Sequence, residues 1–151
     1  MSYVLQAILA KETVIDQLLA ALKAGKKISL EQGFAMIPLD EALIDRIDAT
    51  PDTQTISDLI YLTEAIEEKV LRMLGKEKFA YLESEFFGGS GGHQGILWEA
   101  GKRILKVSES YSGANRILRG LGVIRTSQLD EFDCMGLGRH RSVADWLEEN
   151  P

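Results

Sequence analysis

Cysteine is almost missing from this sequence, in which Cys134 is the single example. One thiol cannot form an intramolecular disulfide, so the composition excludes a disulfide-stabilised domain and favours a reducing compartment. Apolar runs are also short, and none approaches the roughly 20 residues that a membrane helix needs. The opening stretch, MSYVLQAILAK, lacks the basic region and cleavage site of a signal peptide. We therefore expect a cytoplasmic protein with no membrane partner.

Basic side chains are in the minority. The chain has 17 lysines and arginines against 23 aspartates and glutamates, which gives a formal net charge of −6. A surface of this sign repels a phosphate backbone, so a nucleic-acid partner is not expected. An acidic surface suits solubility or a basic protein partner.

The usual signatures of catalysis are also missing. Ser90 lies in a GGSGG stretch, but a nucleophile elbow needs a strand-to-helix turn, and here a strand follows. Cys134 lies among acids, which disfavour a thiolate. No Asp/His cluster with ligand spacing indicates a metal, and the glycine-rich stretch lacks the Gly-Lys-Ser/Thr ending of a phosphate-binding loop. We expect no catalytic residue, metal or cofactor of these kinds.

With 151 residues, the chain is predicted to form one domain, residues 1–151. The order of strand and helix patterns predicts an α+β fold, in which helices pack on one face of an antiparallel sheet. Residues 79–107 should form a three-stranded meander, because turn signals separate runs of strand composition. Apolar spacing predicts a long helix over about 57–74, and the polar stretch 49–55 predicts a loop. The region 125–138 is predicted to be irregular.

A pair of carboxylates occupies the first strand of the meander. Period-two alternation places Phe79, Tyr81, Glu83, Glu85 and Phe87 on one face, while the face of Ala80, Leu82, Ser84 and Phe86 is predicted to point to the core. Side chains two apart on a strand are roughly 7 Å apart, a separation that suits two acids acting on a sugar or a shared cation. The alternative is that both acids stand on a solvated face.

A second unusual stretch, GGSGGH, covers residues 88–93. Its successive amides could bind an anion, or its glycines could supply the positive φ angles of a hairpin tip. Gly88 and Gly89 begin the stretch and His93 ends it. Four glycines exceed what a hairpin needs, and close approach of another backbone or of a ligand would explain the surplus.

The third unusual stretch is GLGRHRS, residues 136–142. Arg139, His140 and Arg141 precede a predicted helix N-terminus, where backbone amides and guanidinium groups favour an anion. The alternative is that the arginines pair with acids, either Glu83 and Glu85 or those at 130–133, and fix the C-terminal segment in place. We expect Arg139 or Arg141 to reach Glu83 or Glu85.

Two of these motifs, YLESEFFGGSGGHQGILW and DEFDCMGLGRHRSVADWL, occur together. In this respect the chain resembles a group of uncharacterised bacterial proteins of similar length, and the resemblance extends from Tyr3 to Trp146. It implies no activity. It does imply that the following residues belong to one shared feature: Tyr81, Glu83, Glu85, Gly88, Gly89, Trp98, Gly138, His140, Arg141 and Trp146.

These observations favour a small binding protein that acts through protein–protein contact, as an inhibitor or immunity-like partner. The alternative is an enzyme or a small-molecule or anion-binding domain that uses Glu83 and Glu85 with Arg139, His140 and Arg141. The two hypotheses differ in one observable. An enzyme or ligand site would need the two acids to line a concave pocket beside His140.

Overall fold

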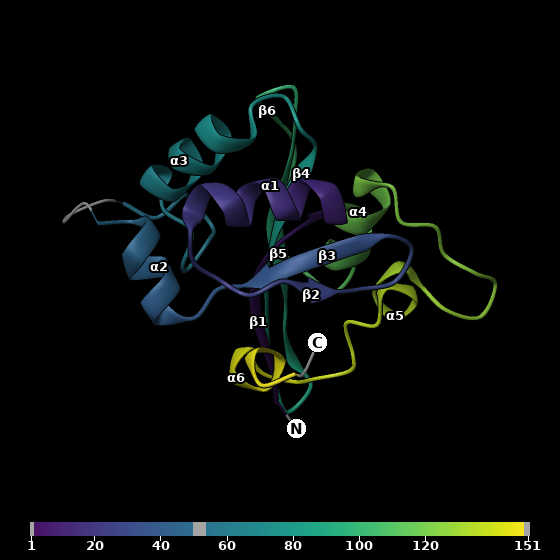
Figure 1. The fold of residues 1–151 in the computed structure, drawn as a ribbon. Helices are drawn as coiled ribbons and strands as arrows, with labels where there is room; N and C mark the ends of the chain where they lie inside the picture. Colours follow the sequence, from purple (N-terminus) through teal and green to yellow (C-terminus); the bar gives the residue numbers. More distant parts are fainter. Residues whose placement is uncertain (1, 50–53, 150–151) are drawn as a thin grey trace.

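The computed structural model describes residues 2–49 and 54–149, with an open antiparallel sheet at the centre (Figure 1). The strands are β1 (Ser2–Lys11), β2 (Ile28–Ser29), β3 (Phe34–Pro38), β4 (Phe79–Phe87), β5 (Ser90–Glu99) and β6 (Lys102–Ser110), and their order across the sheet is β2-β3-β1-β4-β5-β6. The helices are α1 (Glu12–Leu22), α2 (Glu41–Ile47), α3 (Glu64–Leu74), α4 (Gly113–Leu121), α5 (Glu131–Met135) and α6 (Val143–Leu147). The predicted α+β fold and the meander β4-β5-β6 are confirmed.

Helices cover both faces of the sheet, so the prediction of helices on one face is wrong. One core contains Ile8, Tyr81 and Trp98 with residues of α1, α2 and α3. The other contains Leu5, Leu82 and residues of α4, α5 and α6. In Figure 1, α2 and α3 lie to the left of the sheet and α4 and α5 to the right. Both alternating faces of a central strand are therefore buried, and β4 has no single core face.

The helix predicted over 57–74 begins at Glu64. The Thr63 hydroxyl caps it by accepting a hydrogen bond from the Ile66 amide at 3.2 Å. Residues 54–62 form an irregular segment with a turn at 57–58 and a bend at 60–61, in which Ile56, Leu59 and Leu62 still reach the core. The apolar spacing was thus a sign of burial rather than of helix. Of the predicted loop 49–55, residues 50–53 lie outside the described residues.

The glycine-rich connection is shorter than predicted. Gly88 and Gly89 alone form the turn, with φ angles of 61° and 87°, and Ser90 pairs with Phe87 as the first residue of β5. Gly91 lies within the sheet, where an added Cβ would stand 1.9 Å from the Glu85 carbonyl oxygen. The surplus glycine therefore serves the close approach of a neighbouring strand.

Another local expectation is corrected. Residues 131–135, expected to be irregular, form α5, because the Asp130 carboxylate accepts a hydrogen bond from the Asp133 amide at 2.9 Å and Gly136 ends the helix with φ 80°. In α1, Thr13 and Asp16 have the sequence spacing of a capping box, but the N-cap is Lys11, which makes no side-chain cap. No helix in the described part of the chain is both long and apolar enough to cross a membrane.

Candidate functional site

Glu83 is the most heavily hydrogen-bonded side chain of the predicted cluster. It is 3% exposed. Its carboxylate accepts hydrogen bonds from three successive backbone amides, those of Ile60 at 2.9 Å, Tyr61 at 2.7 Å and Leu62 at 3.3 Å. In a helix these amides would donate to carbonyls one turn earlier. The carboxylate therefore holds residues 60–62 outside the helix and beside the sheet.

Two side chains complete the surroundings of Glu83. The Tyr81 hydroxyl donates to one carboxylate oxygen at 2.7 Å, and the Gln94 amide donates to the other at 2.9 Å. Burial, together with the neighbouring Glu83 charge, raises the pKa of Tyr81 far above its ordinary value, so the phenol remains a donor. Both oxygens of Glu83 are thus occupied by groups of the protein itself. Glu85, two residues further on, is half-buried.

Arg139 and His140 bind a different acid from the one predicted. Arg139 donates two hydrogen bonds to the Glu149 carboxylate, at 2.9 and 2.8 Å, and His140 Nε2 lies 2.7 Å from the same carboxylate. The hydrogen bond from Arg139, with that from His140, lowers the pKa of Glu149. The predicted fold-back onto Glu83 or Glu85 is wrong. No ion pair in the described part of the chain joins either glutamate to Arg139 or Arg141.

Helix α6 is fixed in place by the Glu149 cluster, which consists of Arg139, His140 and Glu149. Trp146 is fully buried, with the Arg139 guanidinium 4.9 Å from its ring centroid and the His140 ring 4.7 Å away on its edge. Lys26 donates to the Leu147 carbonyl at 2.8 Å and also to the Glu149 carbonyl. The Arg141 side chain is exposed, but its carbonyl accepts a hydrogen bond from the Val4 amide at 2.8 Å. The segment around α6 is therefore bound to β1.

His93 lies on the face of the sheet opposite to Glu83, the face that α4, α5 and α6 cover. Its Nδ1 atom is 2.6 Å from the Ser84 hydroxyl, and its ring contacts those of Phe86 and Phe132. Ser84 is only 1% exposed, so a substrate could not reach it as a nucleophile. Sequence reasoning did not find this pair, although period-two alternation does place Ser84 and Glu83 on opposite faces.

His93 should make the protein sensitive to acid. Burial lowers the pKa of its ring from 6.5 to about 4. Between pH 6.5 and about pH 4, His93 is therefore protonated in the unfolded chain but neutral in the folded chain. Stability present at neutral pH should fall by about 3 kcal/mol as the pH drops through this window. The measurement is urea unfolding between pH 7 and 4 for the wild type and His93→Asn. Equal losses in the two proteins would show that His93 is not the cause.

An open groove of about 720 Å³ lies between the segment that Glu83 binds and the helix α6 that follows the GLGRHRS stretch. We call it the α2–α6 groove, and it is lined by Val4, Gln6, Asp40, Glu41, Ile44, Asp45, Ile60, Tyr61, Ser142, Val143, Ala144 and Leu147. The segment held by Glu83 supplies Ile60 and Tyr61, and α6, held by the Glu149 cluster, supplies Val143 and Leu147. In Figure 1, α2 lies to the left of β1, and α6 lies across the lower part of β1.

Most of the groove is apolar, with one polar side chain in its floor. Ile60 and Tyr61 are exposed, at 51% and 37%, although both are large hydrophobic residues. Gln6 is 7% exposed, and its side-chain amide has no hydrogen-bond partner in the described part of the chain. The Gln6 amide is not among the buried side-chain groups without a partner, so it is open to the groove and offers one donor group and one acceptor there.

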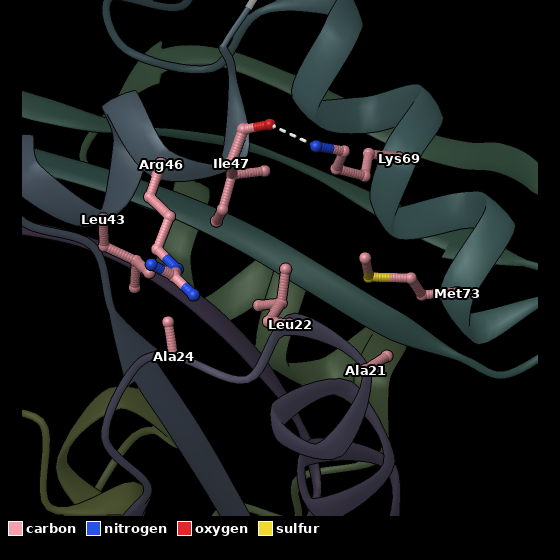
Figure 2. Close-up of a pocket in the computed structure, with 8 residues that line it drawn as sticks. All are labelled: Ala21, Leu22, Ala24, Leu43, Arg46, Ile47, Lys69 and Met73. Carbon is pink, nitrogen blue, oxygen red and sulfur yellow. Dashed lines mark hydrogen bonds between the residues drawn. The ribbon is translucent and has the colours of Figure 1, made fainter.

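A smaller hollow of about 420 Å³ lies between α1, α2 and α3 (Figure 2). Its larger apolar side chains are Leu22, Leu43, Ile47 and Met73, and Figure 2 shows the Arg46 guanidinium between Leu43 and Leu22. The Lys69 ammonium donates to the Ile47 carbonyl at 2.9 Å and so links α3 to α2. This cation is already used within the protein, which makes the hollow a weaker candidate than the groove.

Comparisons of the chain with protein-family models, curated proteins and solved structures found no match. The resemblance to the bacterial group stays a prediction.

Proposed function

We propose that the chain is a protein-binding domain and that the α2–α6 groove is its binding surface. The observation that carries the proposal is an open groove of about 720 Å³ next to exposed Ile60 and Tyr61. Exposed aromatic and aliphatic side chains that gather at a concave surface are typical of binding sites. A role as an inhibitor or immunity-like partner in the bacterial cytoplasm is the more specific form of this proposal.

Rigid walls support the same conclusion. Three amides fix the segment of Ile60 and Tyr61 to one buried carboxylate, and the Glu149 cluster fixes α6. A surface whose shape is set before binding loses less conformational entropy when a partner arrives. The motifs that looked like a chemical site in the sequence therefore support the walls of a recognition site.

The alternative, an enzyme or a small-molecule or anion site, has weaker support. Glu83 makes all its hydrogen bonds within the protein, and Arg139 and His140 bind Glu149. The groove is lined by neither Glu83 nor His140. The geometric condition set for that alternative, two acids in a pocket beside His140, is not met in the described part of the chain.

The proposal is tested by selecting peptides from an unbiased random library on the immobilised protein. Binders should lose at least about tenfold in affinity for Ile60→Asn, because the apolar contact is lost and the new side-chain amide must be desolvated on binding, while the charge of the groove is unchanged. Ile104→Asn is the matched control, since Ile104 on β6 is 50% exposed and lies outside the groove. A selection that yields no binder, or binders indifferent to Ile60→Asn, would contradict the proposal.

A further inference from the structure

We infer that the groove takes a positively charged, partly apolar segment of a partner protein. This inference rests on the proposed function and adds the chemistry of the occupant. Its basis is the charge of the lining together with the unpartnered amide of Gln6.

The charged residues that line the groove are all acidic. Asp40, Glu41 and Asp45 stand along α2, and all three are exposed. Neither lysine nor arginine is among the lining residues. Asp40 accepts a hydrogen bond from the Leu43 amide at 2.8 Å as the helix cap, but Glu41 and Asp45 have no ion-pair partner in the described part of the chain. These carboxylates are available to lysine or arginine side chains of a partner.

The opposite walls and the floor set the other requirements. Ile60, Val143 and Leu147 offer apolar contact, and the exposed ring of Tyr61 can pack against an aliphatic side chain or a cation. The Gln6 amide provides one donor group and one acceptor in the floor. A backbone peptide group has the complementary acceptor and donor, so a polypeptide satisfies Gln6 better than a purely apolar ligand does. A segment that alternates apolar and basic residues would match all three surfaces.

The overall charge of the protein acts in the same direction. A net charge of −6 attracts a basic partner over distances longer than a contact and speeds its encounter. The association should therefore weaken with added salt, because exposed charge pairs are screened.

The test uses the peptides from the random library whose binding depends on Ile60. We expect these peptides to carry net positive charge with interspersed apolar residues. Their affinity, measured by fluorescence anisotropy, should fall about tenfold for the double variant Glu41→Gln/Asp45→Asn and by a similar factor for Gln6→Met. The matched control is Glu31→Gln/Glu77→Gln, which removes two exposed carboxylates outside the groove.

The outcomes separate the two proposals. Positively charged, Ile60-dependent peptides that distinguish the two double variants support the inference. Ile60-dependent peptides that are neutral or acidic, or that bind both double variants equally, overturn the inference while the protein-binding function stands. Peptides that ignore Ile60→Asn overturn both. Urea unfolding of each variant checks that a loss of affinity does not come from a loss of the fold. Gln6→Met should keep wild-type stability, because it removes no side-chain hydrogen bond within the described part of the chain.

Discussion

Replacing Glu83 by leucine should lower the free energy of unfolding by at least about 4 kcal/mol, because several buried donors would lose their acceptor at once. The donors are the backbone amides of residues 60–62, the Tyr81 hydroxyl and the Gln94 amide. An apolar side chain of similar size can fill the space but can accept none of these hydrogen bonds. The measurement is urea unfolding monitored by circular dichroism.

A milder substitution keeps this prediction testable if the leucine variant does not fold. Glu83→Gln retains the size of the side chain but removes the charge. It also replaces one acceptor oxygen by an NH₂ group, a donor that would face the donors around it. It should cost about 2–3 kcal/mol, in the range for hydrogen bonds to a charged group. Glu85→Gln is the matched control on the same strand face, and its half-buried side chain should tolerate the change within about 1 kcal/mol. Equal effects at the two positions would contradict the role assigned to Glu83.

Replacing Trp98 by alanine should cost about 3–5 kcal/mol, the range for removing a large buried aromatic side chain. Trp98 is 1% exposed and stacks on Phe79 with 4.7 Å between ring centroids. Its indole nitrogen also donates to Glu67 at 2.8 Å, and Glu67 in turn binds Arg103. The loss thus includes both packing between the sheet and α3 and one hydrogen bond.

Trp98→Phe separates these two contributions. Phenylalanine keeps a ring against Phe79 but cannot donate to Glu67, which still has Arg103 as a partner. We expect a cost of about 1–2 kcal/mol for this variant. A loss below about 1 kcal/mol for Trp98→Ala in urea melts would mean that the indole contributes little to the core.

The strands were predictable from the sequence because alternation and turn residues are local signals. The hairpin tip at Gly88 and Gly89 and the second turn at Ala100 and Gly101 have the positive φ angles that such turns require. The two-sided burial of β4 was not predictable from alternation alone. Phe79 and Tyr81 on one face and Leu82 on the other are all apolar enough for a core, which is the pattern of a strand covered on both sides.

The site was predictable only in part. The sequence singled out Glu83, Arg139 and His140 as unusual, and each does have a specific partner. The partners were not predictable. Residues 60–62 have the apolar pattern of a helix, but their backbone amides donate to the carboxylate of Glu83, which is distant in the sequence. Glu149 was also missed as the acid for Arg139. Helix α6 lies between the two residues in the sequence, and only its fold brings the Glu149 carboxylate close to the Arg139 guanidinium. The groove itself is assembled from β1, α2, residues 60–61 and α6, so no single stretch of sequence could reveal it.

In the proposed function, Glu83 and the Glu149 cluster support the walls of one binding groove. The most direct test is a backbone amide chemical-shift map of the protein titrated with an Ile60-dependent library peptide. We predict that the largest shifts fall at Val4, Gln6, residues 41–45, Ile60 and Tyr61, and residues 142–147. Shifts concentrated instead at the hollow between α1 and α3, around Leu22 and Met73, or at the Gly88–Gly89 hairpin tip would contradict it.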